Sequence, residues 1–134
     1  MTFAALAVLP DFRALPSREA LLASAVRLWA AAAQRGRAPC PGIAGRLGSE
    51  LAARRLGLLM EMVCAAWTEP FHVGPPCSAR LSHDETLLLA MIDHAAAGDR
   101  SGFERLLAEM IGADARERLY WASRRLAGAF SPPL

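Results

Sequence analysis

The sequence predicts an all-α protein, a compact single-domain bundle of about five helices plus a short helical turn. Alanine and leucine, which have high helix propensity, dominate a composition that is 54% hydrophobic and 21% charged. The residue types that favour strands, such as valine, isoleucine and threonine, are few. Glycines, prolines and helix-capping residues interrupt the apolar segments at intervals typical of helices. Such an apolar composition also argues against a disordered chain.

The 134 residues suffice for one domain, which we divide into three parts. We expect residues 1–16 to form an irregular apolar arm, because Pro10 and Pro16 prevent a continuous helix there. Residues 17–130 are the predicted helical bundle, and residues 131–134 are a tail.

The first predicted helix begins at Ser17, a good N-cap residue, and runs to about Gln34. Apolar residues recur on it at helical spacing, and Gly36 ends it. The prolines that follow predict a loop containing Cys40. After this loop we expect a short helical turn at residues 43–47.

A long helix from Ser49 to about Trp67 is the predicted core element. From Leu56 to Trp67 its only charged residue is Glu61. A helix that is apolar nearly all round is expected to be buried on every side. We therefore predict that Cys64 lies in the core.

Residues 69–81 predict the longest loop, because they are rich in proline and glycine. Ser82 and Glu85 have the spacing of a capping box, which predicts that a helix begins there and continues to about Ala97.

Two further helices complete the predicted bundle. Gly98 ends the preceding helix, and Asp99 begins the next one, which stops at Gly112. Asp114 opens the last helix, which has its own apolar stripe.

Charge and cysteine usage limit the classes of function and location. The net charge of +2 is too small to imply a nucleic-acid partner. All fifteen basic residues are arginine, and the sequence contains neither lysine nor asparagine. Because lysine and asparagine have AT-rich codons, their absence indicates a bacterial source with a GC-rich genome. An odd number of cysteines argues against a disulfide framework and favours the reducing cytoplasm. No apolar run approaches the roughly 18 residues that span a bilayer, so we expect no membrane partner.

Three possible metal ligands fall in or beside the longest loop. His72, Cys77 and His83 could be folded onto one zinc or iron ion by such a loop. Their spacing contains no established zinc motif, so the other interpretation is that they are ordinary loop residues, and we expect no cofactor. A fourth ligand would come from Cys40, Asp84 or Glu85. Cys40 and Cys77 could each also be a reactive thiol.

Arginines in the last helix raise a third hypothesis, DNA binding. Arg118 and Arg125 are seven residues apart and share a helix face, but Asp114 and Glu117 offset part of the charge. A solvated helix face is the preferred interpretation of this pattern.

Short segments within residues 27–89 resemble a known group of proteins. The segments are Arg46-Leu47-Gly48, the apolar stretch 58–66, and Pro75-Pro76-Cys77 followed by Leu81-Ser82. They are similar to small helical proteins of alphaproteobacteria that form a domain family of unknown function. In that group the position of Cys77 tends to fall in a denser cysteine cluster, whereas here Pro76 and Ser78 flank it. The resemblance implies a helical fold and no particular activity.

We therefore predict a small cytoplasmic helical module for protein–protein interaction or regulation, without catalytic activity. No nucleophile elbow, phosphate-binding loop or dinucleotide fingerprint is present. The apolar surplus favours a homodimer, an unidentified protein partner, or both. The alternative is a metal- or thiol-dependent site in the 72–85 region, and DNA binding is the third hypothesis.

Overall fold

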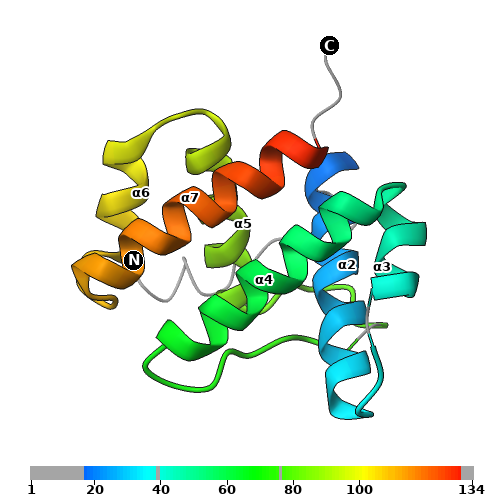
Figure 1. Cartoon of the computed structure of the whole chain (residues 1–134). Coiled ribbons are helices and arrows are strands. Elements are labelled where there is room, and N and C mark those ends of the chain that lie inside the picture. The colour runs from blue at the N-terminus through cyan, green and yellow to red at the C-terminus, as the bar shows by residue number, and fades with distance from the viewer. Residues whose placement is uncertain (1–16, 39, 76, 131–134) are drawn as a thin grey trace.

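A computed structural model describes residues 17–38, 40–75 and 77–130, and this part of the chain is an all-α bundle (Figure 1). The predicted fold class is confirmed. The predicted arm, residues 1–16, and the tail, residues 131–134, lie outside the described residues. The described helices are α2 (Ser17–Gln34), α3 (Cys40–Leu47), α4 (Glu50–Ala66), α5 (His83–Ala96), α6 (Arg100–Leu107) and α7 (Ala113–Phe130).

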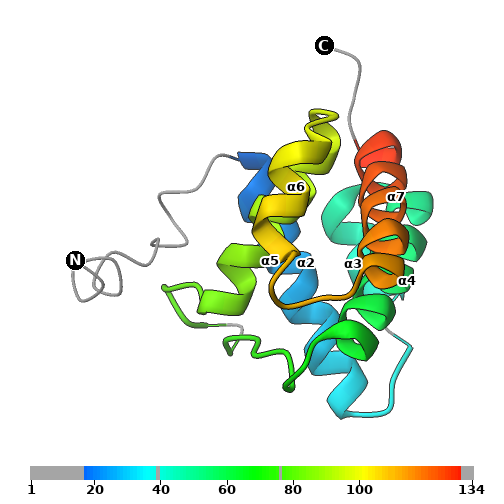
Figure 2. The ribbon, with the colours of Figure 1, turned by 90° about the vertical axis from the view of Figure 1, so that its left-hand side faces the viewer.

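The helices form two layers. In Figure 1, α4 and α7 lie side by side at the front and run in opposite directions. Figure 2 shows this pair edge-on, with α2, α5 and α6 on its other side. The short helix α3 packs against α2 and α4. The front layer therefore has an inner face toward the bundle and an outer face toward solvent.

The core lies between the two layers and is built from large apolar side chains of every described helix. Leu59 of α4 and Leu126 of α7 are fully buried there. Phe103 of α6 packs edge-to-face against Tyr120 of α7, with ring centroids 5.1 Å apart. These contacts fix α7 between the α5–α6 pair and α4.

Side-chain caps hold the starts of three helices, as the sequence predicts. The Ser49 hydroxyl accepts a hydrogen bond from the Ala52 amide at 3.1 Å, and Asp99 accepts one from the Gly102 amide at 2.9 Å. The capping box of α5 is complete, because Ser82 and Glu85 each bond the other's backbone N–H. The predicted helix starts therefore rest on real local interactions.

The short helix α3 begins earlier than predicted. The expected turn at residues 43–47 is a longer helix that begins at Cys40, so Cys40 does not lie in a loop. Pro41 does not prevent this earlier start, because proline is tolerated in the first turn of a helix, where its missing N–H would have no partner.

The prediction that α4 is buried on every side is also wrong. Cys64 is exposed rather than in the core, and the Leu58 side chain is 60% exposed. Neighbouring helices cover α4 from behind and from its sides, and no described segment covers its outer face. No helix in the described ranges is long and apolar enough to cross a membrane.

Candidate functional site

A buried ion pair joins α2 to the start of α5. Arg27 donates to the two carboxylate oxygens of Glu85 at 2.8 and 3.0 Å, and both side chains are 2% exposed. Burial acts to raise the pKa of Glu85. The hydrogen bonds from Arg27, Ser82 and Gly74, together with the Arg27 charge, outweigh it and hold that pKa below its ordinary value. The carboxylate therefore stays ionised beside its guanidinium partner.

The same pair fixes the long loop between α4 and α5. Arg27 also donates to the backbone carbonyls of Ser78 at 2.7 Å and of Arg80 at 2.8 Å. Glu85 accepts a hydrogen bond from the Gly74 amide at 3.2 Å. A Cβ atom on Gly74 would lie 2.9 Å from an Arg27 nitrogen, so the loop passes close to the pair only because this residue is glycine. The pair thus organises the loop.

Asp84 and Ser82 hold the other half of this loop. The Asp84 carboxylate accepts hydrogen bonds from the His72 amide at 2.7 Å and from the Trp67 indole at 3.3 Å. The Ser82 hydroxyl donates to the His72 carbonyl at 2.7 Å. The backbone at His72 is therefore held on both sides, although it belongs to no helix.

The three predicted metal ligands lie on the outside of this loop region. His72, Cys77 and His83 are all exposed. Within the described part of the chain, the structure brings no three His, Cys, Asp or Glu side chains into a group that could hold a metal ion. A zinc or iron site at these residues stays a prediction. The exposed Cys64 lies elsewhere on α4, where partial desolvation raises the pKa of its thiol.

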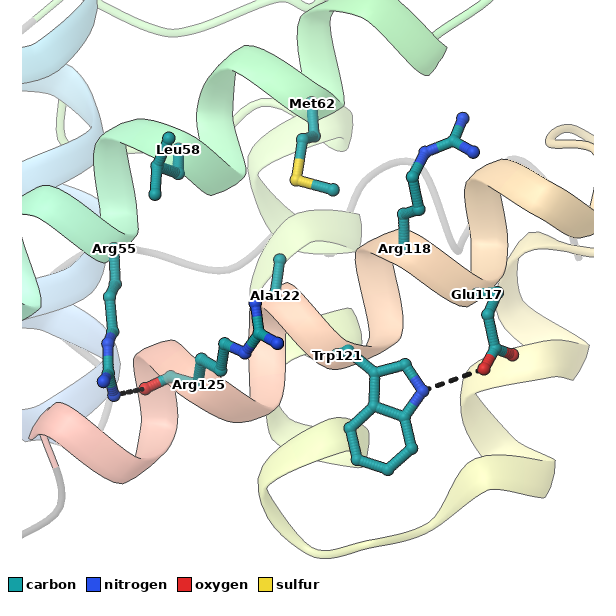
Figure 3. A pocket seen from close by; sticks show the side chains of 8 residues that line it. All are labelled: Arg55, Leu58, Met62, Glu117, Arg118, Trp121, Ala122 and Arg125. Carbon is teal, nitrogen blue, oxygen red and sulfur yellow. Dashed lines mark hydrogen bonds between the residues drawn. The ribbon is translucent and has the colours of Figure 1, made fainter.

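A groove between α4 and α7 is the second notable surface. It encloses about 400 Å³ on the outer face of the front layer (Figure 3). We call this surface the α4–α7 groove, and its lining residues are Arg55, Leu58, Met62, Glu117, Arg118, Trp121, Ala122 and Arg125.

Large apolar side chains form the middle of the α4–α7 groove. Leu58 is 60% exposed and Trp121 is 48% exposed, and Met62 lies on the same face of α4 as Leu58. In Figure 3 Leu58 and Met62 come from one wall, and Trp121 and Ala122 from the other. Side chains of this size are usually buried, and here two of them are exposed on the lining of one groove.

Trp121 is held in place by a chain of contacts. Its indole nitrogen donates to Glu117 at 2.8 Å, and Arg100 donates to the other oxygen of that carboxylate. The Arg100 guanidinium lies 4.3 Å from the centre of the Tyr120 ring, which packs edge-to-face on Trp121. The hydrogen bond from Arg100, followed by that from Trp121, lowers the pKa of Glu117. The orientation of the indole is therefore fixed by contacts within the chain.

Three arginines give the α4–α7 groove its charge. Arg55 donates to the backbone carbonyl of Arg125 at 2.8 Å, which ties α4 to α7. Considering only residues that the structure describes, none forms an ion pair with Arg55, Arg118 or Arg125. The groove therefore combines exposed apolar side chains with positive charge, and in Figure 3 Arg125 lies between Leu58 and Trp121.

A larger hollow, about 590 Å³, lies between the end of α2 and the long loop. Its walls are mostly alanines and loop residues, and Arg27 within it is already bonded to Glu85. It contains no large apolar side chain as exposed as Leu58. We therefore take the smaller α4–α7 groove as the candidate functional site.

Part of this site was visible in the sequence. Arg118 and Arg125 were recognised as sharing a helix face, and the structure places both on the groove. Leu58 was missed because α4 was expected to be buried all round. The available signal is that Leu51, Leu58 and Met62 recur on one face at helical spacing, while Leu56 and Leu59 lie on another.

Comparison with known proteins gives no match: no family model, curated protein or solved structure is similar to this chain. The resemblance to the alphaproteobacterial family therefore stays a prediction.

Proposed function

We propose that this protein is an interaction module that binds a partner protein in the α4–α7 groove and performs no chemistry of its own. The observation that carries this proposal is the joint exposure of Leu58 and Trp121 on two neighbouring helices. An aromatic anchor beside aliphatic side chains is typical of the residues that dominate binding energy at interfaces.

The geometry suits a helical partner. The groove runs between two antiparallel helices, and a third helix can lay its apolar face along such a groove. Full burial of a leucine-sized side chain contributes about 1.5–3 kcal/mol, so half-exposed anchors contribute about 1 kcal/mol each when a partner covers them. Three such anchors together contribute about 3 kcal/mol, whereas a micromolar Kd corresponds to about 8 kcal/mol, so other contacts along the bound helix must supply the rest.

The proposal includes a cytoplasmic location, which the absence of a disulfide framework in the sequence favours. A homodimer remains a second mode of association, supported by the apolar surplus of the chain. Native mass spectrometry of the purified protein tests the homodimer directly, and it would also reveal a bound zinc or iron ion.

Site-specific photo-crosslinking tests the proposed function. A benzoylphenylalanine residue replaces Leu58 in cells that express the chain naturally, and the same residue replaces Ser101, exposed on α6 and outside the groove, as the matched control. We expect a crosslinked protein from position 58 only, and less of it when Trp121→Ala is added. Equal crosslinking at both positions, or none at position 58, would contradict the proposal.

A further inference from the structure

We infer that the segment bound in the α4–α7 groove is an acidic amphipathic helix, an inference that rests on the proposed function. Its apolar side chains cover Leu58, Met62 and Trp121, and its carboxylates pair with the arginines that line the groove. The partner class is thus a protein that carries an exposed helix with leucine-like residues along one stripe and aspartate or glutamate beside it.

The charges of the groove favour an acidic partner. Arg55, Arg118 and Arg125 line it, and none has an ion-pair partner within the described ranges. The one acidic residue of the lining, Glu117, is already bonded by Arg100. The groove therefore presents positive charge that the described part of the chain does not neutralise, and a complementary partner supplies carboxylates.

The spacing of the arginines sets a pattern for the partner. Arg118 and Arg125 are seven residues apart on α7, so they are separated by about 10.5 Å along its axis. A helix aligned with α7 meets both when it carries two carboxylates seven residues apart. Apolar residues three or four positions from each carboxylate then lie over the middle of the groove.

Two other occupants fit less well. A second copy of this chain, related by a two-fold axis through the groove, would bring the same arginines against themselves, because such an interface pairs a surface with itself. A nucleic acid would use the arginines, but its phosphates would leave the apolar middle, with Leu58 60% exposed, without a counterpart.

Binding of two designed peptides tests the inference by fluorescence polarisation. Both are labelled amphipathic helices of about 16 residues with the same leucine stripe, enough for about four turns. One carries glutamates spaced seven residues apart, and the other carries lysines at those positions. We expect saturable binding of the glutamate peptide alone, weakened about tenfold or more by Leu58→Gln and weakened at higher salt.

A charge exchange makes the test specific to the groove. In the variant Arg118→Glu/Arg125→Glu we expect the preference to reverse, so that the lysine peptide binds and the glutamate peptide does not. The matched control is Arg35→Glu/Arg37→Glu, which changes the net charge equally at exposed positions after α2 and should leave both affinities within about twofold. Circular dichroism verifies that each variant is folded.

Several results would overturn the inference. They are equal binding of both peptides, no binding of either, or a loss of affinity for the glutamate peptide in the Arg35→Glu/Arg37→Glu control as large as in Arg118→Glu/Arg125→Glu. Binding of labelled duplex DNA that needs Arg118 and Arg125 but not Leu58 would assign the groove to nucleic acid instead. Crosslinking at position 58 to a protein without an acidic helix would retain the proposed function and reject this occupant. Crosslinking to a second copy would also reject it.

Discussion

At the scale of single residues, Arg27 is a buried charged side chain that bonds three separate parts of the chain. Its guanidinium is almost wholly removed from water and bonds Glu85 and two loop carbonyls. Removing a charge from water is costly, and that cost is offset only when every donor has a good acceptor. The side chain of Arg27 thus joins α2, the long loop and α5.

Replacing Arg27 should therefore destabilise the fold strongly. Arg27→Leu leaves Glu85 as a buried charge without its partner, so we expect the free energy of unfolding to fall by about 3–5 kcal/mol. Arg27→Lys keeps the charge but loses the bidentate geometry, and its free energy of unfolding should lie between those of Arg27→Leu and the wild type. Chemical denaturation measures each loss. Arg54→Leu, at an exposed position on α4, is the control and should change stability by less than about 0.5 kcal/mol. An Arg27→Leu variant as stable as this control would refute the role of the pair.

Glycine substitutions test the close approach of the loop to this pair. Gly74→Ala places a Cβ atom 2.9 Å from an Arg27 nitrogen and should cost about 1–3 kcal/mol. Gly57→Ala, within α4 and with open space around the new Cβ, should instead stabilise the protein by about 0.5–1 kcal/mol. The Tm values of the two variants should therefore shift in opposite directions from that of the wild type. A shift in the same direction would show that the loop adjusts without strain.

At the scale of elements, the contact between α2 and α5 includes two acidic side chains. Glu19 of α2 lies within hydrogen-bonding reach of Asp93 of α5. Hydrogen bonding to Asp93, burial and the Asp93 charge raise the pKa of Glu19 to about 7, although the Arg18 charge acts in the opposite direction. Two carboxylates can share a hydrogen bond only while one is protonated. The contact between these helices therefore depends on pH.

The sign of this dependence follows from the raised pKa. Glu19 contributes stability below its ordinary pKa of 4.5, and the contribution is lost as the pH rises through about 7. Asp93→Asn removes the repulsion, because an amide can donate to the ionised Glu19 carboxylate. Relative to the wild type, we expect this variant to gain about 1 kcal/mol between pH 4.5 and pH 8.

Urea unfolding at both pH values measures that difference. Asp114→Asn, exposed near the start of α7, is the control and should show no comparable change with pH. If Asp93→Asn and Asp114→Asn respond alike, the Glu19–Asp93 contact has no role in the pH dependence of stability.

At the scale of the whole molecule, the outer face of the front layer is separate from the core. Leu58 and Leu59 are adjacent in the sequence, yet one is 60% exposed and the other is fully buried. The core can therefore tolerate changes at the α4–α7 groove, and the groove can change without loss of the fold.

Truncation of these two leucines checks this separation. Leu59→Ala leaves a cavity in the core and should cost about 2–5 kcal/mol. Leu58→Ala should cost less than about 1 kcal/mol of stability and should weaken binding of the glutamate peptide about fivefold. Denaturation and fluorescence polarisation measure the two effects. If Leu58→Ala destabilises the protein as much as Leu59→Ala, then Leu58 belongs to the core.

Local signals explain how much of the fold could be predicted from the sequence. Ser49, Ser82 and Asp99 act within three residues of their partners, so their helix starts were correctly placed. The Arg27–Glu85 pair joins positions 58 residues apart, and no local pattern indicates it.

The candidate site could be predicted less well than the fold. Composition indicates that α4 is apolar, but it does not show which of its faces meets another helix. The exposure of Cys64 and Leu58 depends on the packing of α4 against α7, which only the tertiary structure shows. His72, Cys77 and His83 were selected by residue type, and the sequence contains nothing that fixes their side-chain directions.

The long sequence separation of Arg27 and Glu85 also has a consequence for folding kinetics. Helices held by local caps form rapidly, whereas contacts that close a long segment of chain form slowly. The loop between α4 and α5 depends on this contact, so we expect it to become ordered after α2 and α5 have met. Changes in the loop should accordingly speed unfolding and leave the rate of folding nearly unaltered, so that they shorten the lifetime of the folded state.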